Sequence, residues 1–383
     1  MRYIYLLVVL FFVSFNLRPS ITSIGPLLDI VQRDLGMSGV EASLLTTLPV
    51  FCMGLFSFFA VVLNHRLGIE RSLFIALIFI MMATFFRIFA YDRYFLLATA
   101  LLAGVGIGIS GPILSGFIKK YFADKPGVTG IYSVSMVIGA SLACSLSIPL
   151  YNMWGSSWKK TLSFWGITAL IACMLLLPLL KNVNTKVPTL SKSKAPIKNL
   201  RVWIITLFFG CMSSVFYSIT AWLSPAAQQM GMNHYESGLV LTLFTVIQIP
   251  VSFLIPVVVS KYQHRRNWLL ICGMFELLGI GLLIANASPW LAAPFLGIGA
   301  GGLFPLALLL PIQETADPEQ ATSWSAMIQF GGFILGSLGP VFMGYAVDTF
   351  DDFIPAFLGL MFIVILMMIT IVMIGDKKEA KIE

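Results

Sequence analysis

The chain has 383 residues, of which 58% are hydrophobic and 11% are charged, and its formal net charge is +7. Soluble domains carry about 25% charged residues. This composition therefore excludes an ordinary soluble domain and predicts a polytopic membrane protein.

Apolar stretches long enough to cross a bilayer follow one another along nearly the whole chain. A spanning helix needs about 20 predominantly apolar residues, and the sequence predicts an all-α membrane protein with twelve such helices. The predicted spans are 4–28, 40–63, 72–90, 95–118, 128–150, 160–180, 202–226, 236–260, 267–287, 290–312, 322–346 and 353–375.

The positive charges lie mainly in alternate loops. Most of the 24 Lys and Arg residues fall on the side of the predicted bundle that also carries both chain ends. Because Lys and Arg accumulate in cytoplasmic loops, we expect cytoplasmic N and C termini and a multi-pass protein of a bacterial-type cytoplasmic (inner) membrane. This distribution accounts for the basic net charge without a nucleic-acid partner.

Cysteine and histidine positions suggest no metal or cofactor site. The five cysteines lie in apolar stretches without a CxxC pair, which is typical of small buried side chains rather than disulfides. The three histidines fall in predicted loops. HExxH and GxSxG motifs and paired intramembrane acids are absent from the sequence, so we expect no cofactor, no metal and no enzymatic activity.

The polar stretch KNVNTKVPTLSKSKAPIKNLR (181–201) divides the predicted spans six and six. It is rich in Lys, Ser and Pro and lacks apolar periodicity, which is typical of a flexible linker. The predicted organisation is an N-terminal six-helix bundle (1–180), a cytoplasmic linker (181–201), a C-terminal six-helix bundle (202–375) and a cytoplasmic tail (376–383).

The two halves resemble each other. DLGMSGVEASLLTTL (34–48) matches QMGMNHYESGLVLTL (229–243) at a shift of 195 residues, and GVGIGISGP (104–112) matches GIGAGGLFP (297–305) at a shift of 193. Matches that keep one order along the chain indicate a duplication. Two six-helix repeats around a central axis are typical of a transporter whose substrate site lies near mid-membrane between the halves.

Both glycine-rich segments also satisfy the GxGxxG pattern of dinucleotide-binding proteins. That pattern needs a preceding strand and a soluble βαβ unit, whereas these glycines lie inside predicted spans. The spacings Gly104xxxGly108 and Gly297xxxGly301 instead predict close packing of helices.

The first predicted span carries an arginine and a proline near its centre, in the stretch FNLRPS. A charge at mid-membrane costs at least about 2.5–3.5 kcal/mol, and Pro19 frees the Phe15 carbonyl from the helix. Arg18 is either an anion clamp facing a central cavity, with Asn16 and Thr22 beside it, or the partner of a neighbouring helix. A guanidinium suits the first role because it stays charged and offers planar, bidentate donors.

Two further charges lie within predicted spans. Arg87 is a few residues from the outer end of the third span, so we expect its side chain to snorkel to the interface. Glu276 has three interpretations: a proton carrier, a partner for a distant arginine, or a protonated acid at a helix contact.

Neutral polar and aromatic side chains complete the candidate site. Gln248 and Gln329 occupy the middles of the eighth and eleventh spans, where they either hydrogen-bond between helices or face Arg18 across the axis. Tyr217, Trp222 and Tyr132 are candidates for aromatic walls, with helix packing as the alternative.

The stretches NLRPSITSIGPLL, YSITAWLSP, SGLVLTLFTVIQ, GIGAGGLFPLALLL and MIQFGGF together resemble the cyanate and 2-nitroimidazole transporter branch of the major facilitator superfamily. The resemblance implies a secondary transporter of small polar or anionic solutes. It also implies substrate-contacting roles for six residues: Asn16, Arg18, Thr22, Trp222, Gln248 and Gln329.

The stretch HRLGIER (65–71) resembles a degraded form of the superfamily's signature loop. Arg66, Gly68 and Arg71 match that loop, whereas His65 replaces its aspartate. The functional interpretation is a cytoplasmic gate latch, and the alternative is charge that only sets the topology.

We therefore expect a monomeric secondary active transporter that lies in the lipid bilayer and moves a small polar or anionic solute, similar to cyanate or a nitro-heterocycle, by alternating access. The first alternative is a proton-driven exporter of toxic or drug-like compounds, with Glu276 as the proton carrier. The second is a receptor or channel on the same scaffold.

Overall fold

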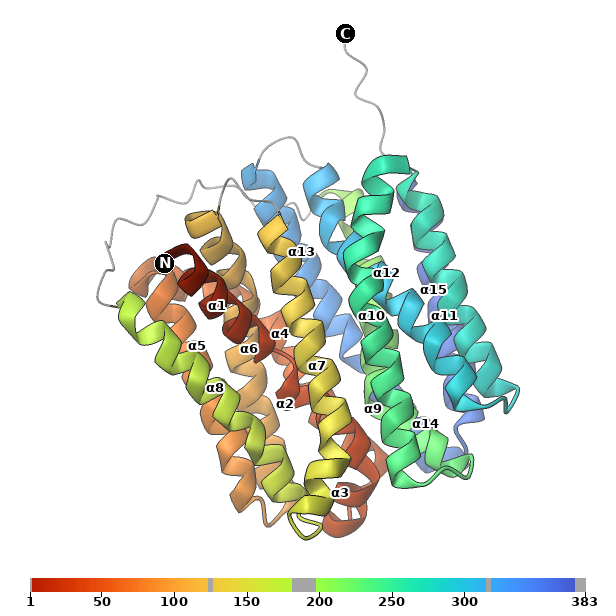
Figure 1. Ribbon diagram of the computed structural model, residues 1–383. Helices are drawn as coiled ribbons and strands as arrows, with labels where there is room; N and C mark the ends of the chain where they lie inside the picture. Colours follow the sequence, from red (N-terminus) through yellow and green to blue (C-terminus); the bar gives the residue numbers. More distant parts are fainter. Residues whose placement is uncertain (1, 123–126, 181–197, 263, 315–317, 376–383) are drawn as a thin grey trace.

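A computed structural model describes residues 2–122, 127–180, 198–262, 264–314 and 318–375, and these ranges are helical with short connections (Figure 1). The helices are α1 (Arg2–Phe15), α2 (Pro19–Thr22), η1 (Gly25–Leu27), α3 (Leu28–Leu35), α4 (Gly39–Leu67), α5 (Ile69–Phe86), η2 (Arg87–Phe89), α6 (Arg93–Phe122), α7 (Gly127–Met153), α8 (Trp158–Leu180), α9 (Leu200–Gln229), α10 (His234–Tyr262), α11 (Arg265–Ile284), α12 (Pro289–Glu314), α13 (Pro318–Gly336), α14 (Leu338–Phe350) and α15 (Ile354–Ile374).

Twelve stretches of the described residues are helical, long and apolar enough to cross a membrane, which confirms the predicted fold class. The start of α1 and the end of α15 lie at the same end of the bundle, hereafter the terminal end (Figure 1). The opposite end is called the far end. Most of the predicted linker (181–201) and the predicted tail (376–383) lie outside the described residues, and α9 begins at Leu200.

The first span, Tyr3–Leu35, is broken where the sequence places its proline. α1 ends at Phe15 and α2 begins at Pro19, which cannot donate a backbone hydrogen bond. Helix α7 packs along the break, with Gly139 against the Phe15 carbonyl group. Farther along α7, the thiol of Cys144 donates to the Thr22 carbonyl at 3.4 Å.

The glycines of α6 and α12 alternate between two neighbouring helices. On α6, a Cβ on Gly104 would lie 2.5 Å from Pro49 Cα of α4, whereas one on Gly106 would lie 2.6 Å from the Ala76 carbonyl oxygen of α5. On α12, Gly297 contacts α10 and Gly299 contacts α11 in the same way. Both GxGxxG segments are therefore helix-packing segments, as the sequence predicts.

The two halves meet along α4 with α13 and α14, and along α7 with α10. At the far end, the Asp348 carboxylate of α14 accepts hydrogen bonds from the backbone N–H groups of Gly39 (2.6 Å) and Val40 (2.9 Å). These groups open α4, so the carboxylate caps a helix N-terminus that carries partial positive charge. One acid of the second half thus fastens a helix of the first half.

The close packing of α7 on the broken first span predicts that a larger side chain at Gly139 destabilises the fold. We expect Gly139→Ala to lower the free energy of unfolding by about 1–3 kcal/mol, because the added methyl group would overlap the Phe15 carbonyl. Gly111→Ala on α6 is the matched control, since a Cβ there meets no atom within 4 Å. It should be neutral or stabilising by up to about 1 kcal/mol. Thermal unfolding in detergent measures both, and equal effects would contradict the packing described.

Candidate functional site

Arg18 lies in the break of the first span and points across the axis into the second half. Its side chain is only 6% exposed. The guanidinium Nη1 donates a hydrogen bond of 3.2 Å to the Tyr217 hydroxyl of α9, and that hydroxyl in turn lies 3.6 Å from Met53 Sδ of α4. The arginine of the first half is therefore held by a neutral phenol of the second.

Aromatic rings surround the guanidinium. Its central carbon lies 4.9 Å from the ring centre of Phe216, 5.6 Å from that of Tyr217 and 5.5 Å from that of Phe304. Each cation–π contact contributes about 0.5–2 kcal/mol, depending on desolvation. Together these contacts stabilise a charge that lies far from bulk water.

A small cavity adjoins the guanidinium. Its volume is about 10 Å³, which is close to the minimum for one water molecule. Apart from Arg18, all of its lining residues belong to the second half: Met212, Ser213, Phe216, Tyr217, Ala300, Phe304 and Phe333. A substrate larger than water therefore requires the halves to separate here.

Within the described residues, Arg18 forms no ion pair with a carboxylate. In the described part of the chain its charge is balanced by the phenol and the rings alone, so an anion entering the cavity would meet a cation without a competing acid there. Ser213 adds a hydroxyl to the same cavity. The repeat shift of 195 residues relates Ser213 to Arg18 itself, so equivalent positions of the two halves face each other.

Asn16 and Thr22 support the broken backbone rather than line this cavity. The Asn16 amide donates to the Phe12 carbonyl at 2.7 Å and to the Thr168 carbonyl of α8 at 3.1 Å, and it accepts from the Thr168 hydroxyl at 2.7 Å. The Thr22 hydroxyl donates to the Arg18 carbonyl at 3.1 Å. Both residues fix the position from which the arginine side chain extends.

The second-half residues predicted from the family resemblance do not line the cavity beside Arg18. Trp222 Nε1 donates to the Pro340 carbonyl at 3.1 Å. The Gln248 amide donates to the Phe244 carbonyl of its own helix at 3.0 Å, and Gln329 is half-buried on α13. None of the three lines the cavity beside Arg18 in this conformation.

Of the predicted aromatic walls, Tyr217 contacts Arg18 directly. Tyr132 of α7 is half-buried and close enough to interact electrostatically with both Arg18 and Tyr217. No motif in the sequence indicated Ser213, Phe216 or Phe304. The repeat shift would have indicated Ser213, whereas the two phenylalanines resemble many others in the spans.

The prediction that Arg87 snorkels to the interface is wrong. Its side chain is fully buried, at 0% exposure. The position near the end of α5 was correct, but the side chain lies on the buried face of that helix, together with Ile80 and Thr84.

Glu276 is buried on α11 against Gly299 of α12, inside the second half. Its Oε2 atom has no hydrogen-bond partner among the described residues, and the carboxylate forms no ion pair within them. This position corresponds to the helix-contact interpretation, and the proton-carrier role stays a prediction.

The loop between α4 and α5 makes a tight turn at Gly68, whose φ of +81° favours glycine. Arg66 and Arg71 are exposed and form no ion pair among the described residues. Their role as a gate latch stays a prediction.

An ion pair with a largely buried carboxylate lies at the terminal end of each half. Glu70 of α5 accepts from Lys120 of α6 at 2.6 Å. In the second half, Glu314 of α12 pairs with Arg265 of α11 and with Arg201 of α9. The repeat shift of 195 residues relates Glu70 of α5 to Arg265 of α11. The acid lies on the earlier helix of the pair in the first half and on the later helix in the second half.

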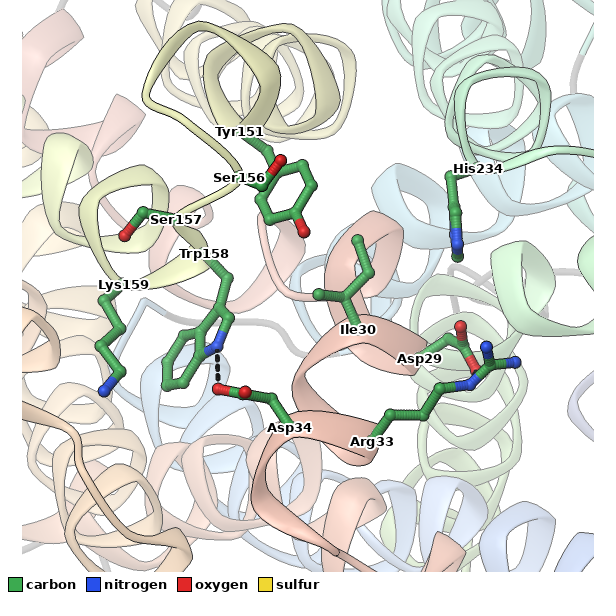
Figure 2. Close-up of a pocket in the computed structure, with 10 residues that line it drawn as sticks. All are labelled: Asp29, Ile30, Arg33, Asp34, Tyr151, Ser156, Ser157, Trp158, Lys159 and His234. Atoms are coloured by element: carbon green, nitrogen blue, oxygen red, sulfur yellow. Dashed lines mark hydrogen bonds and ion pairs between the residues drawn. The ribbon is translucent and has the colours of Figure 1, made fainter.

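A larger pocket of about 630 Å³ opens at the far end (Figure 2). Its carboxylates are already engaged: Asp29 pairs with Arg33 at 3.1 Å, and Asp34 accepts from Trp158 Nε1 at 2.7 Å. Lys159 and His234 also line it, so its charges are mixed. This pocket does not include Arg18, and we do not place the substrate there.

Comparison with known proteins identifies the class of protein. The Major Facilitator Superfamily profile matches residues 6–340, and the chain belongs to this superfamily of membrane transporters. The cyanate transport protein CynX of Escherichia coli (strain K12) is 32% identical over 88% of this chain and 89% of that protein. The 2-nitroimidazole transporter of the same organism is 27% identical over 96% of this chain and 95% of that protein.

The fold likeness extends to solved structures. A D-xylose-proton symporter superposes with a TM-score of 0.77 and covers 98% of both chains. The identity of the two sequences is 12%, so this likeness concerns the fold alone.

The ion pairs of Glu314 predict an acid-sensitive stabilisation. Burial raises the pKa of this carboxyl, but hydrogen bonds from Arg201 and Arg265 outweigh burial and hold the pKa below its ordinary value. The stabilisation is therefore present at neutral pH and is lost as the pH falls through the lowered pKa.

We expect Glu314→Gln to lower the free energy of unfolding at pH 7 by about 3 kcal/mol, because it leaves the buried Arg265 without its anion. The control is Asp29→Asn, which breaks an ion pair to an exposed arginine on the same helix and should cost about 0.5 kcal/mol or less. Unfolding followed over a pH series from 7 down to about 2 measures both. A Glu314→Gln loss that stays equally large down to the acid end of the series would contradict the electrostatic origin.

Proposed function

We propose that the protein is a secondary active transporter that moves a small anion across the cytoplasmic membrane by alternating access. The observation that carries the proposal is Arg18. It is a buried guanidinium between the two halves, held by Tyr217 and aromatic rings and by no acid among the described residues. Such a group attracts anions and excludes cations.

The relatives support the substrate class. One is named for cyanate and another for a 2-nitroimidazole. Cyanate is a small anion, and a nitro group presents two oxygens in a plane, which suits bidentate hydrogen bonds from a guanidinium. We extend this class, small anions and nitro-heterocycles, to the present chain.

The geometry suggests how binding couples to movement. An anion beside Arg18 would contact the first half through the guanidinium and the second half through Ser213 and the Tyr217 hydroxyl. It would therefore favour conformations in which the halves approach each other around it, since a ligand shifts a population by its differential affinity. Release of the Asp348 cap on α4 would accompany opening at the far end.

We infer from the positive loops that the terminal end faces the cytoplasm, and the Asp348 contact would then lie on the outer side. In the present conformation this outer contact is formed and the central cavity is small. We expect the anion to enter or leave through rocking of one six-helix half against the other, with the chain acting as a monomer.

A proton-driven exporter on the same fold is the second candidate, and Glu276 is the observation that favours it. A buried carboxyl with an unpartnered oxygen suits a group that binds and releases a proton. Glu276→Gln should abolish proton-driven accumulation but leave exchange of the substrate intact if this acid carries the proton.

The role of Arg18 is tested by ligand-dependent thermal stability of the purified protein. We expect cyanate, nitrate, a small carboxylate or 2-nitroimidazole to raise the melting temperature of the wild type through mass action. The shift should vanish in Arg18→Ala, and Arg18→Lys should retain only part of it because the bidentate geometry is lost.

The matched control for this experiment is Arg93→Ala, which removes a far-end arginine already paired with Glu41. It should keep the full ligand-induced shift. A shift that survives in Arg18→Ala, or the lack of any shift in the wild type, would contradict the proposed site.

A further inference from the structure

Arg87 is a second buried arginine, and it lies apart from the cavity beside Arg18. It occupies the junction of α5 and η2, near the far end of the first half, and its side chain is 0% exposed. It is not among the residues that line the central cavity. The transport cycle proposed above makes no use of it.

All three guanidinium nitrogens of Arg87 lack a hydrogen-bond partner among the described residues. Other buried arginines differ in this respect: Arg18 donates to Tyr217, and Arg265 pairs with Glu314. Arg87 also forms no ion pair within the described part of the chain. A guanidinium stays protonated in proteins, so a full positive charge is enclosed here.

The acids at this end of the first half are already engaged elsewhere. Glu41 pairs with Arg93 at 3.1 Å, Asp34 accepts from Trp158 at 2.7 Å, and Asp92 caps α6 by accepting from the Phe95 backbone N–H at 2.9 Å. No carboxylate among them reaches Arg87. A buried charge without an opposite charge strongly destabilises a folded protein.

A second unpartnered donor lies on the helix that packs against α5 and η2. The indole Nε1 of Trp165, on α8, is buried and has no hydrogen-bond acceptor among the described residues. Both unpartnered groups can only donate hydrogen bonds. The Trp165 ring packs against Phe15 of α1 and Phe164, so Arg87 alone requires a further ligand. The missing partner of Arg87 is an acceptor, and the charge of the guanidinium requires that this acceptor be negative.

We propose that Arg87 binds a small monovalent inorganic anion, of the size of a halide or nitrate, as a resident structural ligand of the first half. Water would accept hydrogen bonds but would leave the charge uncompensated. This anion is distinct from the transported solute, because it lies inside one half and away from the cavity between the halves. The folded state of the protein should then depend on anions even when the transport site is disabled.

Bromide is the probe, and Arg18→Ala is the background, so that binding at the central site cannot contribute. Melting temperatures are measured in sodium bromide and in sodium gluconate at equal ionic strength, because gluconate is too large for an enclosed site. We expect a saturable rise of about 5 °C with bromide, the size that mass action gives for a ligand well above its dissociation constant. The rise should be absent in Arg18→Ala/Arg87→Met.

Arg18→Ala/Arg93→Met is the matched control, since Arg93 lies at the same end of the first half but is paired with Glu41. It should keep the rise. An equal rise in the Arg87→Met variant, or no rise in Arg18→Ala, would overturn the proposal.

A crystallographic measurement covers the case in which Arg87→Met does not fold. Crystals of the wild type soaked in sodium bromide should show an anomalous scattering peak within hydrogen-bond distance of the Arg87 guanidinium. Such a peak in wild type soaked at low millimolar bromide supports a resident site. Density for water alone at Arg87, or a peak only at molar bromide as an adventitious ion, would overturn it.

Discussion

One constraint organises the molecule: a permanently charged guanidinium lies in the middle of a membrane-spanning helix. Pro19 breaks the helix beside Arg18, and α7 packs along the break, where Cys144 and Ser147 donate to the carbonyls of Thr22 and Ser23. The charge itself is stabilised by the hydroxyl of Tyr217 and by aromatic rings from the opposite half. Removing a charge from water without an acid partner is costly. A site that tolerates this cost is therefore well suited to receive an anion.

The rest of the fold makes each half a rigid body around this centre. Alternating glycines bring α6 against α4 and α5, and α12 against α10 and α11. Buried ion pairs at Glu70 and Glu314 then fix the terminal ends of these helices. The halves also meet along whole helices, α4 with α13 and α14 and α7 with α10, and the Asp348 carboxylate caps the first turn of α4. The proposed rocking would have to rearrange these contacts while the packing inside each half stays intact.

Sequence patterns were sufficient for the membrane spans and the break at Pro19, because these follow from hydropathy and backbone chemistry. They also identified Arg18, since a charge inside an apolar stretch is conspicuous. They did not determine which face of a helix a side chain occupies. Trp222 and Gln248 therefore hydrogen-bond to helix carbonyls away from Arg18, and Arg87 is buried rather than at the interface.

Counterflow in proteoliposomes measures whether the Arg18 guanidinium binds the transported anion. Vesicles loaded with unlabelled cyanate are diluted into labelled cyanate, and transient accumulation is followed for the wild type, Arg18→Lys and Arg18→Ala. We expect saturable counterflow in the wild type, a raised KM in Arg18→Lys and no counterflow in Arg18→Ala. Undiminished counterflow in Arg18→Ala would show that the Arg18 guanidinium does not bind the transported anion.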